Sequence, residues 1–260
     1  MKPVRVPDLQ SMKDRGEKIA VLTAYDFTMA RLLDRAGIDV VLVGDSLGMV
    51  VLGYETTVPV TLDMMVHHTS AVSRGAKRAL IVTDMPFMTY QLSAEDAMRN
   101  AGRLIQEGGA AAVKIEGGRH IAEMAKRLVD IGIPVMGHLG LTPQSVHQLG
   151  GFRPQGRDAA AGEKLLKDAE LLEKAGVFSI VLESIPAELA GRVTASVKVP
   201  TIGIGAGPQC DGQVLVSYDA FGLSEGPVPP FAKQYAQLGE SMLTAARAYI
   251  EDVRAGGPHR

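Results

Sequence analysis

Five side chains that could act in catalysis or metal binding each follow a short run of β-branched and apolar residues. They are Asp45, Asp84, Glu116, His138 and Glu183. Carboxylates bind hard cations such as Mg²⁺ and also accept protons, and an imidazole can serve in either role. In (β/α)8 barrels the active-site residues lie at the carboxyl ends of the strands. The pattern therefore predicts one site that contains a hard metal ion and a proton-accepting base.

Strand alternation indicates which way these side chains point. Lys114 stands two residues before Glu116, so both side chains share one face of a strand, and the intervening residues face the helices. The same alternation pairs Asp45 with Val43 on an inward-facing row. Several buried like charges are costly without a counter-ion, so we expect Lys114 and a divalent cation to compensate the acids.

The types of the candidate ligands favour Mg²⁺. The acids are accompanied by no cysteine and by only one strand-end histidine, and Mg²⁺ takes one or two carboxylates plus water and substrate oxygens. His138 is either a further ligand or a hydrogen-bonded histidine of the pocket. Arg153 and Arg157 lie in a Gly-rich stretch that is either a lid meeting a substrate carboxylate or a solvated loop. Cys210 has no basic neighbours and is expected to be inert.

Eight short apolar runs alternate with stretches of helical spacing. We predict strands at 19–24, 40–44, 79–84, 111–116, 134–138, 178–183, 199–204 and 212–217. Parallel strands joined by helices require right-handed crossovers, and eight such units favour a closed (β/α)8 TIM barrel over an open doubly wound sheet.

Helix signals lie between these runs. Asp158 and Gly176 bracket a helix over 158–175, Ser93 opens a helix toward Glu107, and Thr142 precedes a proline in a helical start. Residues 1–260 are expected to form a single domain, with the part before residue 19 less regular.

Composition excludes several classes of protein. The chain has 260 residues, a formal net charge of −2, no tryptophan and 5% aromatic residues, which disfavours a nucleic-acid surface. No apolar run reaches the length of a membrane span, and the start lacks the apolar region of a signal peptide. A single cysteine allows no internal disulfide. We expect a cytoplasmic enzyme that acts on small molecules without a nucleic-acid or membrane partner.

The candidate residues lie within longer strings that occur in a fixed order. These strings are Thr-Ala-Tyr-Asp (23–26), Val-Gly-Asp-Ser-Leu-Gly-Met-Val-Val-Leu-Gly-Tyr (43–54), Val-Pro-Val-Thr-Leu-Asp-Met-Met (58–65), Val-Lys-Ile-Glu-Gly-Gly (113–118), Gly-His-Leu-Gly-Leu-Thr-Pro-Gln-Ser (137–145), Leu-Glu-Ser-Ile-Pro (182–186) and Asp-Gly-Gln-Val-Leu-Val (211–216). Together they closely resemble the ketopantoate (3-methyl-2-oxobutanoate) hydroxymethyltransferase family over almost the whole chain.

The resemblance implies a phosphoenolpyruvate/pyruvate-type TIM barrel of pantothenate and coenzyme A biosynthesis. Such an enzyme transfers a hydroxymethyl unit from 5,10-methylenetetrahydrofolate to 3-methyl-2-oxobutanoate, which gives 2-dehydropantoate and tetrahydrofolate. It would carry one Mg²⁺ per subunit and assemble as a homodecamer.

The resemblance also assigns roles to individual positions. Asp45, Asp84 and Glu116 match the Mg²⁺-site acids. The oxo-acid-binding positions are matched by Asp45, Ser46, Asp84 and Lys114. Glu183 matches the catalytic proton acceptor.

Two other readings compete with this one. A Mg²⁺-dependent 2-oxo-acid lyase or mutase of the phosphoenolpyruvate mutase/isocitrate lyase type would also chelate its substrate at acidic strand ends. Such lyases usually carry a catalytic cysteine in a basic loop, whereas Cys210 has no basic neighbour. A barrel that only binds a ligand would have kept the metal acids and lost Glu183. The ordered strings and the complete set of acids disfavour both.

Overall fold

The computed structural model describes residues 2–224, 226 and 228–257. Contacts divide the chain into two units, residues 1–214 and 215–260. The strands are β1 (Ile19–Thr23), β2 (Val40–Val43), β3 (Leu80–Asp84), β4 (Ala112–Glu116), β5 (Val135–Gly140), β6 (Ser179–Glu183), β7 (Thr201–Ile204) and β8 (Gly212–Leu215). They form a closed barrel in sequential order, with parallel pairing. The predicted (β/α)8 barrel is confirmed, and all eight predicted strands are present with bounds that differ by at most two residues.

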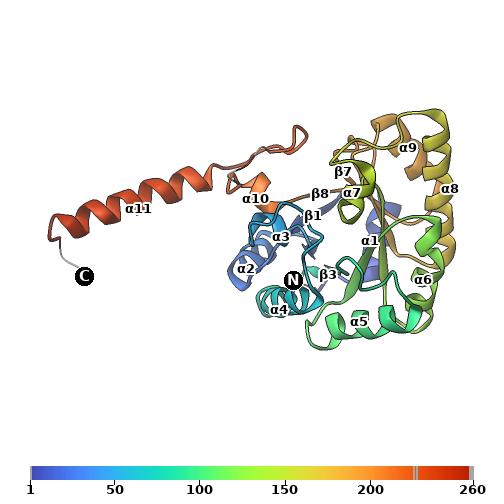
Figure 1. The fold of residues 1–260 in the computed structure, drawn as a ribbon, viewed down its shortest axis with the longest axis horizontal. Helices are drawn as coiled ribbons and strands as arrows, with labels where there is room; N and C mark the ends of the chain where they lie inside the picture. Colours follow the sequence, from blue (N-terminus) through green and yellow to red (C-terminus); the bar gives the residue numbers. More distant parts are fainter. Residues whose placement is uncertain (1, 225, 227, 258–260) are drawn as a thin grey trace. The chain divides into compact units, whose positions relative to one another are not determined.

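In the first unit, helices connect the strands and pack around the barrel (Figure 1). They are α1 (Val6–Asp14), α2 (Phe27–Ala36), α3 (Leu47–Val50), α4 (Leu62–Gly75), α5 (Ala94–Gln106), α6 (Arg119–Asp130), α7 (Val146–Leu149), α8 (Ala159–Ala175) and α9 (Ala187–Ser196), with a 3-10 turn η1 (Pro143–Ser145). The second unit contains α10 (Ser217–Ala220) and α11 (Leu238–Arg254). No helix among the described residues is both long enough and apolar enough to cross a bilayer.

The helix ends follow the side-chain signals in most cases. Asp158 accepts a hydrogen bond from Ala161 N–H at the start of α8, and Gly176 ends this helix in the left-handed conformation. Ser93 caps α5 in the same way. Thr142 differs, because its side chain makes no cap and Pro143 opens only the short turn η1. This short turn places the residues after β5 back over the strand ends.

The barrel interior is filled by alternate side chains of the strands. The interior cluster includes Val40 and Leu42 of β2 and Ala112 of β4. The predicted inward direction of Lys114 and Glu116 agrees with Ala112, which shares their face. The pairing of Val43 with Asp45 was wrong, because the inward residues of β2 are Val40 and Leu42. β2 ends at Val43, so Asp45 follows in a turn where strand alternation no longer applies.

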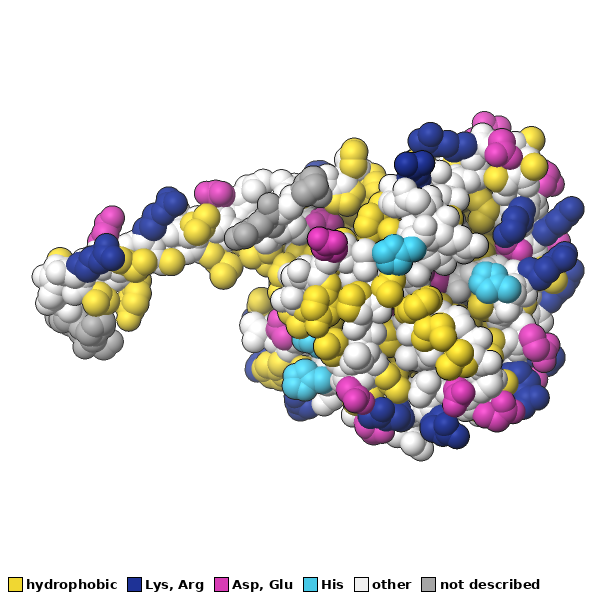
Figure 2. All heavy atoms as spheres, viewed as in Figure 1, with side chains coloured by type: hydrophobic (Ala, Val, Ile, Leu, Met, Phe, Trp, Pro, Cys, Tyr) yellow, Lys and Arg dark blue, Asp and Glu magenta, His cyan; other side chains and the backbone are white. Residues whose placement is uncertain are grey.

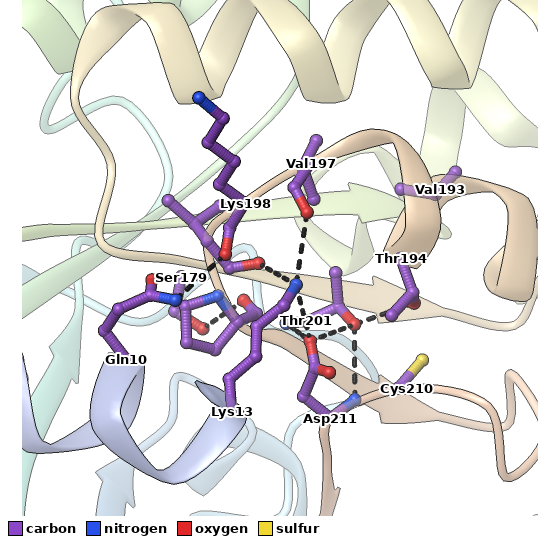
Figure 3. A network of polar contacts seen from close by, with 12 residues as sticks. Gln10, Lys13, Ser179, Val193, Thr194, Val197, Lys198, Thr201, Cys210 and Asp211 are labelled. Carbon is purple, nitrogen blue, oxygen red and sulfur yellow. Dashed lines mark hydrogen bonds and ion pairs between the residues drawn. The ribbon is translucent and has the colours of Figure 1, made fainter. Parts of the chain in front are cut away.

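Helix α1 covers the end of the barrel where the strands begin. Leu9 is fully buried within the interior cluster. Lys13 Nζ donates to Val197 O at 3.1 Å and Val199 O at 2.9 Å, and it lies 3.1 Å from Asp211 Oδ2 (Figure 3). The expectation of an irregular start was wrong, because Pro7 at the helix start and the apolar Leu9 form a regular helix that seals this end. The opposite end, where the strands finish, is left for chemistry.

Candidate active site

The register of the central strands brings the predicted residues together at their carboxyl ends. Asp84 pairs with Lys114 across β3 and β4, and Glu116 pairs with His138 across β4 and β5. All four of these side chains are at most 5% exposed. Glu183 ends β6, and its side chain is 15% exposed. The predicted cluster therefore forms on adjacent strands.

Lys114 is the cationic centre of this cluster. Its Nζ lies 3.0 Å from Asp84 Oδ1, 3.7 Å from Glu116 Oε1 and 3.1 Å from His138 Nδ1. Burial acts to lower the pKa of Lys114, but the negative charges of Asp84, Glu116 and Asp45 outweigh burial and raise it. The ammonium therefore stays charged and offsets part of the acidic charge around it.

The three acids differ in their electrostatic surroundings. Burial raises the pKa of Asp45 well above its usual value, and the charges of Asp84 and Glu116 act in the same direction. Burial also raises the pKa of Asp84, although Lys114 opposes this. For Glu116 burial is outweighed by its neighbours His138 and Lys114 and by a backbone N–H, so the pKa is lowered. Negative charge at Asp45 and Asp84 is thus only partly compensated by the protein.

His138 bridges Lys114 and Glu183. Its Nδ1 faces Lys114 Nζ, which can only donate, and its Nε2 lies 3.1 Å from Glu183 Oε2, which can only accept when ionised. Burial and the charge of Lys114 act to lower the pKa of His138, but Glu116, 3.4 Å from Nδ1, and Glu183 outweigh them and raise the pKa to about 9. The contact to Glu183 has ion-pair distance but not hydrogen-bond geometry. His138 is buried in this cluster, and its role as a further ligand or as a pocket histidine stays a prediction.

The side chain of Ser46 is hydrogen-bonded to Tyr25. The Tyr25 hydroxyl and Ser46 Oγ lie 2.8 Å apart, and Tyr25 is buried. A Cβ atom at Gly44 would lie 2.7 Å from Ser46 Oγ, so a larger residue here would displace this hydroxyl from its position. Asp45 N–H donates to Asp84 Oδ2 at 3.0 Å, which ties the turn after β2 to the end of β3.

Two uncharged residues of the site were missed by the search for acids and bases. Gln144 in η1 and Tyr90 in the loop after β3 are both buried, and both hydrogen-bond to residues of the cluster. Gln144 lies in the Thr-Pro-Gln string shortly after β5, and its place in this string was the sequence signal that could have marked it as a site residue. In contrast, Arg153 and Arg157 are exposed in the loop before α8, and their roles stay predictions.

The fit of these residues to a hard cation depends on two carboxylates. Among the described residues, no group of three or more Asp, Glu, His or Cys side chains is placed to ligate a single ion directly. Asp84 Oδ1 is nevertheless buried without a hydrogen bond of proper geometry, although Lys114 lies close to it. One or two carboxylates suffice for Mg²⁺. Asp45 and Asp84 therefore fit as direct ligands, and Glu116 is engaged by other groups.

Solved structures with low sequence identity share this barrel. A crystal structure of 2,3-dimethylmalate lyase, a member of the PEP mutase/isocitrate lyase superfamily, matches with a TM-score of 0.63 and 17% identity over 98% of this chain and 89% of that one. A phosphonopyruvate hydrolase complex with oxalate and Mg²⁺ matches with a TM-score of 0.65 and 12% identity over 98% and 88%. These likenesses confirm the type of barrel.

Relatives with much higher identity are similar over nearly the whole chain. The 3-methyl-2-oxobutanoate hydroxymethyltransferase of Moorella thermoacetica (strain ATCC 39073 / JCM 9320) is 60% identical over 253 residues, which cover 97% of this chain and 94% of the relative. The protein of the same name from Thermoanaerobacter sp. (strain X514) is 59% identical over 95% and 90%. A model of the ketopantoate hydroxymethyltransferase family matches residues 3–258. Because the family model and the Moorella relative each match nearly the full length of the chain, the chain belongs to the ketopantoate hydroxymethyltransferase family.

Proposed function

We propose that the protein is a 3-methyl-2-oxobutanoate hydroxymethyltransferase of pantothenate and coenzyme A biosynthesis. It transfers the one-carbon unit of 5,10-methylenetetrahydrofolate to 3-methyl-2-oxobutanoate and, with one water, gives 2-dehydropantoate and tetrahydrofolate. The observation that carries this proposal is the buried set of Asp45, Asp84, Lys114 and Glu116 at the strand ends of a chain about 60% identical to proteins of that name. A set of this composition suits a 2-oxo acid, which brings a carboxylate and a polarisable carbonyl.

One Mg²⁺ per subunit fits the site, with Asp45 and Asp84 as its protein ligands and Glu116 beside them. A bound Mg²⁺ would supply Lewis-acid polarisation of the oxo acid. The support from the structure is the buried oxygen of Asp84 that lacks a well-formed hydrogen bond, together with the incompletely compensated acids. These residues also leave coordination positions for water or substrate oxygens, as Mg²⁺ requires.

The chain's own residues divide the work of substrate binding and proton transfer. Ser46, oriented by Tyr25, donates a hydrogen bond to the substrate carboxylate. Lys114 offers positive charge to the keto oxygen, where negative charge grows as the proton leaves. Glu183 takes the proton from C3 of the oxo acid. C3 then bonds to the methylene carbon, both C–N bonds of that carbon to the folate break, and water supplies its hydroxyl group. His138, which faces Glu183 across 3.1 Å, holds this carboxylate in place.

Glu183 suits the role of base because of its place. It ends β6 and remains partly exposed, whereas Lys114 and the three metal-site acids are almost completely buried. Glu183→Gln keeps the size of the side chain and removes its basicity. We expect kcat to fall by about 10²-fold or more, while binding of the oxo acid persists. Near-normal turnover would remove Glu183 from the role of base.

We also propose that the enzyme is a cytoplasmic homo-oligomer, with a decamer indicated by the resemblance. Helix α11 supports self-association, because none of its residues is buried and one side carries Leu238, Met242, Tyr249 and Val253 (Figure 2). Exposed apolar stripes of this kind mark interaction surfaces. A second copy of the chain is the proposed occupant. Sedimentation velocity checks the assembly, and a monomer at micromolar concentration would contradict it.

The reaction is tested by measuring ketopantoate formation from both substrates, with Mg²⁺ or with EDTA. Metal-dependent product is the expected result. If a folded protein binds the oxo acid through Mg²⁺ but forms no ketopantoate, the folate reaction is wrong. Cleavage or rearrangement of a 2-oxo acid in the same preparation would instead favour the lyase or mutase alternative.

A further inference from the structure

Gln144 directs both of its amide hydrogens at the ends of two strands. The side chain lies in η1 and the residue is 5% exposed. Its Nε2 donates to Asp45 Oδ2 at 2.9 Å and to the backbone oxygen of Met85 at 2.9 Å. The backbone oxygen of Met85 can only accept, so it fixes which end of the amide is nitrogen. One oxygen of Asp45 is therefore held by an uncharged donor.

The backbone of Gln144 holds a second acid. Its N–H donates to Glu116 Oε2 at 3.1 Å. A single residue after β5 thus contacts the carboxylates of the β2 and β4 ends. Asp84 is joined to this set through its Oδ2, which accepts from Asp45 N–H. Each of the three acids consequently has one oxygen restrained by an uncharged N–H group.

Tyr90 sets the orientation of the Gln144 amide. Its hydroxyl accepts from Glu116 N–H at 3.1 Å and donates to Gln144 Oε1 at 2.8 Å, with the backbone oxygen of Glu116 as a longer alternative acceptor at 3.2 Å. The ring is 1% exposed, which leaves it little freedom. The result is a directed chain of hydrogen bonds from Glu116 N–H through Tyr90 and Gln144 to Asp45. Gln91 adds a longer contact to the same Oε1, at 3.3 Å.

We propose that Gln144 is a positioning residue for the acidic cluster, acting on Asp45 through its side chain and on Glu116 through its backbone, with Tyr90 fixing its amide. This inference rests on the proposed function, because the acids it positions are the expected Mg²⁺ ligands and oxo-acid contacts. Groups that orient metal ligands usually affect metal affinity or activity by about 10- to 100-fold when they are changed. Gln144 restrains one carboxylate oxygen of Asp45 and leaves the other oxygen available to a cation.

The test uses Gln144→Met, which has nearly the same volume and keeps the backbone N–H. Mn²⁺ binding, followed by electron paramagnetic resonance, should weaken about 10- to 100-fold. Tyr90→Phe removes one neutral hydrogen bond at each of two partners and should weaken Mn²⁺ binding by about 2- to 10-fold. In the double variant the losses should be less than additive in free energy, because both changes act on one chain of bonds. Gln106→Met, the same substitution at an exposed glutamine of α5, is the matched control and should bind Mn²⁺ like the wild type.

Thermal melting separates positioning from folding. A purely structural role would lower Tm and leave Mn²⁺ affinity of the folded protein unchanged. That result, or an affinity of Gln144→Met within twofold of the wild type, would overturn the proposal. If Gln144→Met does not fold, Tyr90→Phe decides by the same comparison. Failure of the wild type to form ketopantoate would disprove the proposed function, whereas the metal-binding comparison would still decide the role of Gln144.

Discussion

Replacement of Lys114 by methionine is expected to destabilise the apo protein strongly and to make its stability depend on divalent metal. Lys114 Nζ lies 3.0 Å from Asp84 Oδ1 and 3.7 Å from Glu116 Oε1 in a cluster that is almost completely buried. Methionine retains most of the aliphatic length and removes the charge. The acids Asp84, Glu116 and Asp45 would then lose the positive charge of the lysine that compensates them.

The magnitude follows from these distances. With an effective dielectric constant of about 20, the gross attractions are about 5.5 kcal/mol at 3.0 Å and about 4.5 kcal/mol at 3.7 Å. Desolvation of the ammonium offsets several kcal/mol of this sum, so the net value of the pairs is smaller. Breaking a buried pair still costs about 3–5 kcal/mol, because the partner charge remains buried. We expect the free energy of unfolding to fall by about this amount in EDTA.

Added Mg²⁺ should recover part of the loss. A ligand at 100 times its dissociation constant stabilises the folded state by about 2.7 kcal/mol. The Lys114→Met pocket is more negative, so at equal Mg²⁺ concentration the variant should gain more stability than the wild type. Urea unfolding in EDTA and in millimolar Mg²⁺ measures both effects. Lys167→Met, at an exposed lysine, makes the same change in net charge and serves as the control. A Lys114→Met protein as stable as this control in EDTA would refute the reasoning, as would equal metal stabilisation of both.

Three further expectations concern the scaffold around the site. In Gly118→Ala the new Cβ would lie 2.2 Å from Asp168 Cγ and Oδ2, so we expect a loss of about 1–3 kcal/mol in urea unfolding, and wild-type stability would show that this contact relaxes freely. The Asp34 carboxylate accepts hydrogen bonds from the backbone N–H groups of residues 77–79, which outweigh its burial and lower its pKa below the ordinary 3.8. Its contribution to the free energy of unfolding is therefore full above pH 3.8 and is lost as pH falls through the folded-state pKa. Asp34→Asn should therefore cost about 1.5–3 kcal/mol at pH 7 and less toward pH 3, and a pH-independent difference would contradict this. Burial raises the pKa of the Cys210 thiol, so a disulfide reagent should react with the native protein at least roughly tenfold more slowly than with the unfolded chain, and equal rates would show that the thiol is accessible.

The strand-end acids were predictable because barrel strands are short and each ends at a marked change of residue type. Asp84, Lys114, Glu116 and Glu183 lie within strands whose inward row could be counted along the sequence. The alternation failed for Asp45, because the residue lies past the end of β2, where the backbone turns. Pairing across β3 and β4 could not be counted from either strand alone. The expectation of a single domain and the individual site roles stay predictions.

The sequence by itself determined the eight strands, the ends of most helices, the membership of the family and the residue types of the site, because these depend on local periodicity, capping groups and ordered motifs. Only the tertiary structure decided how the charges are compensated. It placed Lys114 among three acids, set His138 between Lys114 and Glu183, and brought Gln144 onto Asp45 across 99 positions of the chain. Most of those contacts join different strands or the turns that follow them, and their distances arise from barrel closure and register, which no local pattern encodes.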